Sequence, residues 1–148
     1  VLGLSLAIAP AGAWLAVRTD IHPAPLLLSV FTFLWVAGFD IIYQSLDVDF
    51  DTEHRLHSIP ADLGVSAGLA ISLLLHILSI ITACLIPVLM EWHMLTYAGV
   101  TILAIVTMLQ HIAIKKHGVG IFERIFVPVN GSASILIMLL FVAGYVLR

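Results

Sequence analysis

The chain alternates between long apolar stretches and short polar breaks. Five apolar stretches follow one another, at about residues 1–17, 26–46, 64–86, 94–114 and 129–147. A helix needs about 20 mostly apolar residues to cross roughly 30 Å of hydrocarbon, and four of the five stretches approach that length. Because a membrane span must satisfy its own backbone hydrogen bonds, the pattern predicts an all-α fold: a polytopic transmembrane helix bundle of about five helices.

The polar breaks predict where these helices begin and end. Residues 22–25 (His-Pro-Ala-Pro) are expected to be extended, since the residue before a proline is disfavoured in a helix. Pro87 is expected to end the third helix, and residues 122–128 to form the connection before the fifth. Gly118 follows three basic residues, a pattern typical of a helix C-terminus. Asp62 is expected to cap the third helix.

Composition indicates that the chain lies in a lipid bilayer. Of its 148 residues, 61% are hydrophobic and 10% are charged, whereas soluble domains are about 25% charged. The net charge of −3 comes largely from one acidic stretch, so no nucleic acid is expected as a partner. Val1 already reads as the interior of a helix. We therefore expect residues 1–148 to form a single transmembrane domain, a fragment that lacks N-terminal helices.

The acidic stretch follows the second apolar stretch and carries the candidate chemistry. Steps of three and four residues place five polar side chains on one helix face: Asp40, Tyr43, Gln44, Asp47 and Asp51. Like charges one turn apart repel each other, and a cation would remove that cost. Carboxylate oxygens suit a hard ion, and Mg²⁺ usually takes one or two carboxylates together with substrate phosphates. The stretch therefore predicts a Mg²⁺-diphosphate site.

The alternation of Asp47, Asp49 and Asp51 also resembles the start of a calcium-binding EF-hand loop. That interpretation fails, because Thr52 stands where the loop needs glycine and Ser58 where it needs a bidentate glutamate. In a continuous helix Asp49 would lie about 200° from Asp47 and point away from the shared face, unless the helix has already ended.

Basic residues predict the orientation in the membrane. Up-and-down threading places residues 47–63 and 115–128 on one side. Four basic residues lie on that side and two elsewhere: Arg55, Lys115, Lys116 and Arg124, against Arg18 and Arg148. By the positive-inside rule, we expect a multi-pass protein of the inner (cytoplasmic) membrane with the acidic loop on the cytoplasmic side. Lys115 and Lys116 either bind phosphate oxygens or only set this topology.

Asp40, His76 and His111 lie inside the predicted spans. An acid there is costly and usually has a function, which leaves an ion- or proton-coupled transporter fragment as an alternative. Transporters place their charges at mid-membrane, whereas the acids of this chain cluster at one edge. The two histidines have no carboxylate at ligand spacing, so we expect packing or interhelical hydrogen bonds from them.

The motif Tyr43-x-x-x-Asp47-x-x-x-Asp51, with Leu-His-Ser-Ile-Pro at residues 56–60 and then Gly64, resembles the second acidic motif of the UbiA superfamily of membrane prenyltransferases. The sequence is most similar to the 4-hydroxybenzoate polyprenyltransferases, including the related enzymes of the futalosine route to menaquinone. Residues 2–17 look like the family helix before this motif, and residues 129–131 look like the start of its last helix. The resemblance covers the whole chain but only the C-terminal half of a nine-helix bundle.

This resemblance implies transfer of a polyprenyl group from polyprenyl diphosphate to a hydroxylated aromatic acid, a benzoate or a naphthoate, in ubiquinone or menaquinone biosynthesis. In the family, Mg²⁺ held by two acidic motifs binds the diphosphate, whose departure leaves an allylic cation that the aromatic ring attacks. Asp47 and Asp51 would face the metal and the diphosphate. Asp49 would be a further metal ligand, and the ring of Tyr43 would stabilise the cation.

The same resemblance assigns the neighbouring residues to substrate binding. Gln44 and Asp40 would line the pocket. Arg55, His57 and Ser58 would belong to a mobile cap that keeps water away from the cation.

The sequence departs from the family pattern at two points. The family's first motif, an asparagine followed at steps of four by two aspartates, is absent from the chain. The missing N-terminal half is therefore expected to be needed for activity, and the fragment alone to be inactive. His54-Arg55 stands where relatives usually carry a glycine. A noncatalytic membrane half-module, which only packs against the missing helices, stays an alternative.

Overall fold

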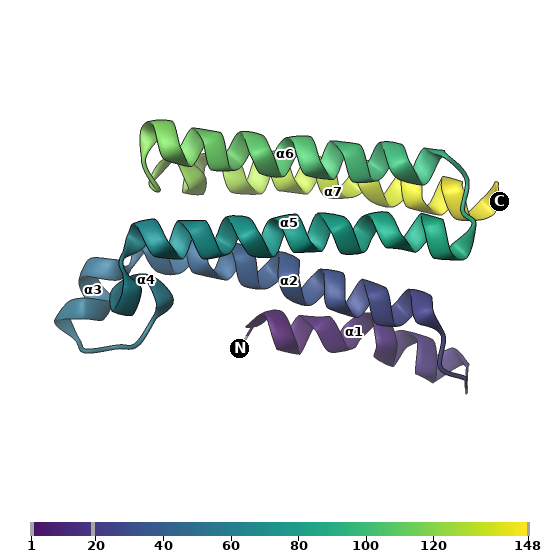
Figure 1. The fold of residues 1–148 in the computed structure, drawn as a ribbon, viewed down its shortest axis with the longest axis horizontal. Helices are drawn as coiled ribbons and strands as arrows, with labels where there is room; N and C mark the ends of the chain where they lie inside the picture. Colours follow the sequence, from purple (N-terminus) through teal and green to yellow (C-terminus); the bar gives the residue numbers. More distant parts are fainter. Residues whose placement is uncertain (1, 19, 148) are drawn as a thin grey trace. The chain divides into compact units, whose positions relative to one another are not determined.

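The structure, a computed structural model, describes residues 2–18 and 20–147. Within these ranges every regular element is a helix. The elements α1 to α7 are, in order (Figure 1), Leu2–Val17, Pro23–Leu46, Val48–Glu53, Ile59–Leu63, Val65–Met90, Leu95–His117 and Ile121–Val146. Four of them, α2, α5, α6 and α7, are long and apolar enough to cross a membrane, and α1 is apolar but shorter. The predicted all-α polytopic bundle is confirmed.

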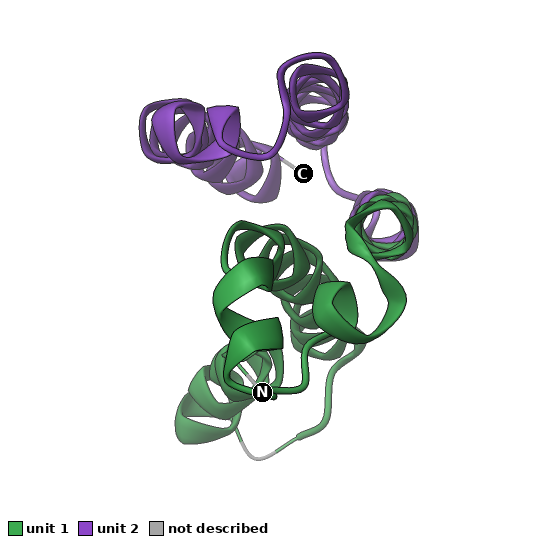
Figure 2. Cartoon of the chain, turned by 90° about the vertical axis from the view of Figure 1, so that its left-hand side faces the viewer, with its two compact units in different colours: residues 1–79 green, residues 80–148 purple. Residues whose placement is uncertain are grey.

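The chain divides into two compact units, residues 1–79 and 80–148, and the division falls inside α5 (Figure 2). In the first unit α1 packs along α2, while α3 and α4 pack against each other and against α2. In the second unit α6 packs against α7. The acidic stretch, at the end of α2 and in α3, belongs to the first unit. The packing of α2 against its neighbours therefore positions the acidic side chains. That residues 1–148 form one domain stays a prediction.

The start of α2 differs from the extended connection expected at residues 22–25. The helix begins at Pro23, and the ring of His22 accepts a hydrogen bond at Nδ1 from the amide of Ala24 at 3.3 Å. Proline fits the first turn of a helix because its missing N–H would have no partner there. The two prolines therefore start this helix rather than delaying it.

Prolines inside two other helices were expected to interrupt them and do not. α5 continues through Pro87 to Met90, and α7 starts at Ile121 and runs through Pro128. A proline removes one hydrogen bond, whereas ending the helix inside hydrocarbon would leave several backbone groups without partners. The expected end at Pro87 and the expected connection over residues 122–128 were therefore wrong.

The end of α6 agrees with its sequence pattern. The helix ends at His117, and Gly118 takes a φ of 83° while its amide donates to the carbonyl of Ile114 at 2.8 Å. That left-handed conformation is open to glycine at little cost. The expected C-terminal cap is confirmed.

Glycines allow α6 and α7 to approach closely. A Cβ built on Gly144 would meet Oγ1 of Thr96 and would lie 3.2 Å from the Thr96 amide nitrogen. A Cβ on Gly99 would lie 3.1 Å from the Phe141 ring. The amide of His93 also donates to the Gly144 carbonyl at 3.2 Å. Small residues at such contacts are typical of helix pairs in membranes.

We predict that Gly144→Ala lowers the stability of the α6–α7 pair by about 1–3 kcal/mol, because the added methyl group overpacks the contact with Thr96. Gly131→Ala is the matched control, since it lies in the same helix and a Cβ there meets nothing within 4 Å. Thermal unfolding in detergent, followed by circular dichroism, measures both variants. Equal melting temperatures for the two would contradict the proposed contact.

Candidate functional site

The acidic residues lie where α2 gives way to α3. α2 ends at Leu46, and Asp47 has φ −99° and ψ 8°, with its amide bonded to the carbonyl of Gln44 at 3.2 Å. The expected end of the second helix at Leu46 is therefore confirmed, and Asp51 lies on the next helix, α3, rather than on a continuation of the face that carries Asp40. The amide of Asp51 then donates to the carbonyl of Asp47 at 2.8 Å. The two aspartates therefore remain one helical turn apart, as expected.

The carboxylates differ in their exposure. Asp47 and Asp49 are exposed, while Asp51 is half-buried. Asp49 and Asp51 lie in the first turn of α3, where the partial positive charge of a helix N-terminus favours acidic side chains. Asp40 lies two turns before Asp47 inside α2 and is half-buried. The site thus has two or three accessible carboxylates at its rim and one deeper in the span.

Tyr43 and Gln44 lie on α2 between Asp40 and the rim. Tyr43 is 37% exposed. The amide oxygen Oε1 of Gln44 is buried and has no hydrogen-bond partner among the described residues. Because an unpaired buried acceptor is costly, this oxygen is a candidate for a hydrogen bond that the described residues do not supply.

A tight turn connects α3 to α4. The amide of Leu56 donates to the carbonyl of Asp51 at 2.8 Å, and the ring of His54 stacks on Phe50 with centroids 4.0 Å apart. Arg55 has a φ of 55°, a left-handed conformation that glycine adopts without steric cost and arginine does not. A glycine would therefore suit the position before the Leu-His-Ser-Ile-Pro run. Arg55 adopts this left-handed conformation at some cost in backbone strain.

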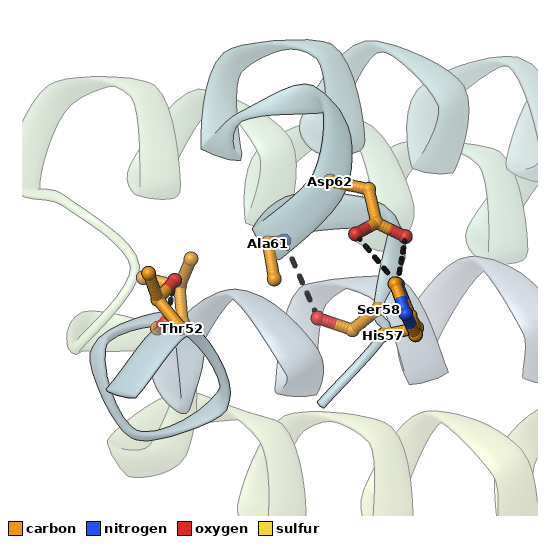
Figure 3. Close-up of polar contacts among 6 residues, drawn as sticks. Thr52, His57, Ser58, Ala61 and Asp62 are labelled. Carbon is orange, nitrogen blue, oxygen red and sulfur yellow. Dashed lines mark hydrogen bonds and ion pairs between the residues drawn. The ribbon is translucent and has the colours of Figure 1, made fainter. Parts of the chain in front are cut away.

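Side-chain hydrogen bonds then organise α4 (Figure 3). Ser58 is its N-cap, and its Oγ accepts from the amide of Ala61 at 3.3 Å. The ring nitrogen Nδ1 of His57 lies 3.1 and 3.3 Å from the two carboxylate oxygens of Asp62. Asp62 lies inside α4 and pairs with His57, so its expected role as the cap of the following helix was wrong. This pair is a contact that sequence spacing did not indicate.

We predict that Ser58→Ala loosens α4, because an N-cap side chain contributes about 1 kcal/mol. Amide hydrogen exchange at Ala61 should become roughly fivefold faster. Ser66→Ala is the control, since Ser66 is exposed on the next helix. Unchanged exchange at Ala61 would show that the cap bond does not order this segment.

Lys115 and Lys116 occupy the last turn of α6, in the second unit, and both are exposed. Their positive charges are therefore accessible to solvent or to a phosphate group. Whether they serve the acidic site stays a prediction.

The donor set agrees only in part with a metal centre. Among the described residues, no three His, Cys, Asp or Glu side chains come together in an arrangement that could hold a metal ion. The carboxylates of Asp47 and Asp51, one turn apart, still match the needs of Mg²⁺, which takes one or two carboxylates and completes its shell with waters and substrate phosphates. The chain thus offers part of a Mg²⁺ site rather than a complete protein cage.

The model of the UbiA prenyltransferase family matches residues 1–119, a range that includes α1 to α6 and every candidate site residue. No curated protein and no solved structure matches the chain.

Proposed function

The chain belongs to the UbiA prenyltransferase family, and from this premise we propose that it transfers a polyprenyl group from polyprenyl diphosphate to a hydroxylated aromatic acid in quinone biosynthesis. The observation that carries this proposal is the pair Asp47 and Asp51, one turn apart at the end of a membrane-spanning helix. Family membership implies prenyl transfer to an aromatic acceptor. The 4-hydroxybenzoate or naphthoate acceptor and the ubiquinone or menaquinone pathway are the finer part of the proposal.

Asp47 and Asp51 bind the diphosphate end of the prenyl donor, with Asp49 as a further oxygen ligand. Their negative charges alone would repel a diphosphate, so these residues need a divalent cation between themselves and the substrate. Mg²⁺, when bound, neutralises charge on the diphosphate and makes it a better leaving group. Asp47 and Asp49 are exposed and can reach such an ion from the rim of the site.

The side chains on α2 serve the organic parts of the substrates. Tyr43 is one residue before Gln44 and one turn before Asp47, so its ring lies between the diphosphate end and the deeper part of the span. A ring face there stabilises positive charge on the prenyl carbon. The unpaired Oε1 of Gln44 accepts a hydrogen bond from the aromatic acid, and Asp40 lines the same pocket.

The α3–α4 segment acts as the cap. Arg55, His57 and Ser58 lie in its turn and at the start of α4, where they exclude water from a cation that hydrolysis would otherwise consume. Lys115 and Lys116, on α6 of the second unit, are exposed and carry the charge that phosphate oxygens bind. We place the cap on the cytoplasmic side of the inner membrane.

A second acidic motif is required for the complete site. The described residues supply no group of three metal-binding side chains, and the sequence has one acidic motif. We propose that N-terminal helices supply the other ligands and that this chain alone is inactive. Assaying Mg²⁺-dependent prenyl transfer with and without a co-expressed N-terminal half checks this. Full transfer by the chain alone would contradict it.

Substitution of the aspartates tests the proposal itself. Asp47→Asn and Asp51→Asn in the complete enzyme should each lower prenyl transfer by about 100-fold or more, the scale of losing one preorganised electrostatic group. Glu53→Gln is the matched control, because Glu53 is exposed on the same short helix. Membrane insertion should be unchanged in all three variants. Wild-type turnover in both aspartate variants would exclude this site.

A further inference from the structure

Three residues of α5 form a regular stripe of small and polar groups that faces α2. Gly68, Ser72 and His76 follow one another at steps of four residues and are all buried. We call this stripe the α5 seam. Each member approaches α2 closely, and Gly68 also approaches α4. The α5 seam therefore connects the helix that carries the acidic residues with the helix of the cap.

His76, the third residue of the α5 seam along the chain, makes a buried contact with α2. Its ring is fully buried, lies 4.4 Å from the Phe39 ring between centroids, and places Nε2 3.3 Å from the carbonyl oxygen of Trp35. A carbonyl only accepts, so Nε2 is assigned as the donor. This interhelical hydrogen bond confirms the role expected for His76. It ties a side chain of α5 to the backbone of α2.

The approach of His76 depends on the absence of a side chain at Gly38. A Cβ built on Gly38 would lie 2.5 Å from Nε2 of His76, closer than carbon and nitrogen atoms can pack. Ser72, one turn along the α5 seam, donates from Oγ to the carbonyl of Gly38 at 2.7 Å. Gly38 thus leaves room for the His76 ring, and its carbonyl accepts a hydrogen bond from the Ser72 hydroxyl.

Gly68 reaches both α2 and α4. A Cβ on Gly68 would lie 3.5 Å from Cγ2 of Ile41 and 3.2 Å from Cγ of Pro60. Pro60 belongs to α4 and is buried. The same stripe therefore holds the cap helix at the end of α5 nearest the acidic residues.

This arrangement admits one register of α2. Moving α2 by one residue shifts it about 1.5 Å along its axis and turns it by about 100°. Ala37 or Phe39 would then replace Gly38 opposite His76, and the bonds to the Trp35 and Gly38 carbonyls would be lost. Within hydrocarbon no water replaces such bonds, so polar contacts of this kind select one register, whereas uniform apolar packing would tolerate several.

We propose that Gly38 and His76 are positioning residues. Together with the rest of the α5 seam they set the rotation and depth of α2, and so place Tyr43 and Asp47 for the reaction. Asp47 directly follows the last residue of α2 and is nine residues beyond Gly38, about 13 Å along the helix axis. A stiff helix carries a change of register over that length. The catalytic consequence rests on the proposed prenyl transfer, while the structural consequence does not.

The experiment reports the position of α2 without requiring activity. Leu46→Cys in a Cys84→Ser background places one thiol at the end of α2, and its alkylation rate by a water-soluble maleimide measures local exposure. Gly38→Ala and His76→Leu should each change that rate by about threefold or more, the scale of one interhelical hydrogen bond in a membrane. His76→Gln keeps a donor and should lie closer to wild type. Gly131→Ala, whose Cβ meets nothing within 4 Å, should change nothing.

Activity of the complete enzyme, without the added cysteine, gives the second readout. The half-saturating Mg²⁺ concentration for prenyl transfer should rise by about threefold or more in Gly38→Ala and His76→Leu, and His76→Gln should restore it. Melting temperatures identify the variants that fold. If Gly38→Ala does not fold, the comparison of His76→Leu with His76→Gln still tests the positioning role. Unchanged alkylation and unchanged Mg²⁺ dependence in folded His76→Leu would overturn the proposal. If the wild type transfers no prenyl group, the proposed function fails while the alkylation rates still test the positioning role.

Discussion

The contact between Gly38 and His76 is the constraint on which the candidate site depends. A glycine on α2 leaves room for a buried imidazole from α5, and the imidazole then bonds to the α2 backbone at Trp35. Membrane helices gain little from hydrophobic association, because lipid is as apolar as their side chains. Close approach and a few polar bonds must therefore set their positions. Tyr43, Gln44 and Asp47 follow Gly38 on the same helix or just beyond it, so their placement follows from this contact.

The chemistry of the rim follows from how α2 ends. At the end of α2 the amide of Asp47 bonds to the carbonyl of Gln44, three residues earlier. The short helix α3 follows and keeps Asp47 and Asp51 one turn apart. The α3–α4 segment is then shaped by local features. These are the strained turn at Arg55, the pairing of His57 with Asp62, and the hydrogen bond by which Ser58 caps the N-terminus of α4. Carboxylates thus meet solvent at the membrane edge, while Asp40 and the unpaired Gln44 oxygen lie deeper. Charged groups therefore lie at the rim of the candidate site, and polar groups of α2 lie deeper in the span.

The sequence predicted the spans, the glycine cap at Gly118 and the spacing of Asp47 and Asp51, because each depends on residues close together in the chain. It misplaced the start of α2, because a proline in the first turn of a helix loses no hydrogen bond. It misplaced the start of α7 and the end of α5, because the cost of a proline inside a helix depends on whether water or lipid surrounds the freed carbonyl. It also missed the short helices α3 and α4 after Asp47 and the partner of Asp62. Those features depend on how α3 and α4 fold back on α2, which hydrophobic periodicity does not encode. The buried role of His76 could be anticipated, but the glycine opposite it could not.

Binding of the prenyl donor tests the central claim most directly. Geranyl diphosphate would be titrated calorimetrically into the complete protein, once with Mg²⁺ and once with EDTA. If Asp47, Asp49 and Asp51 hold the diphosphate through a divalent cation, binding should be at least about tenfold tighter with Mg²⁺. Equal affinity in EDTA would mean that the acidic residues do not bind the diphosphate in this way, and the account of the site would be wrong.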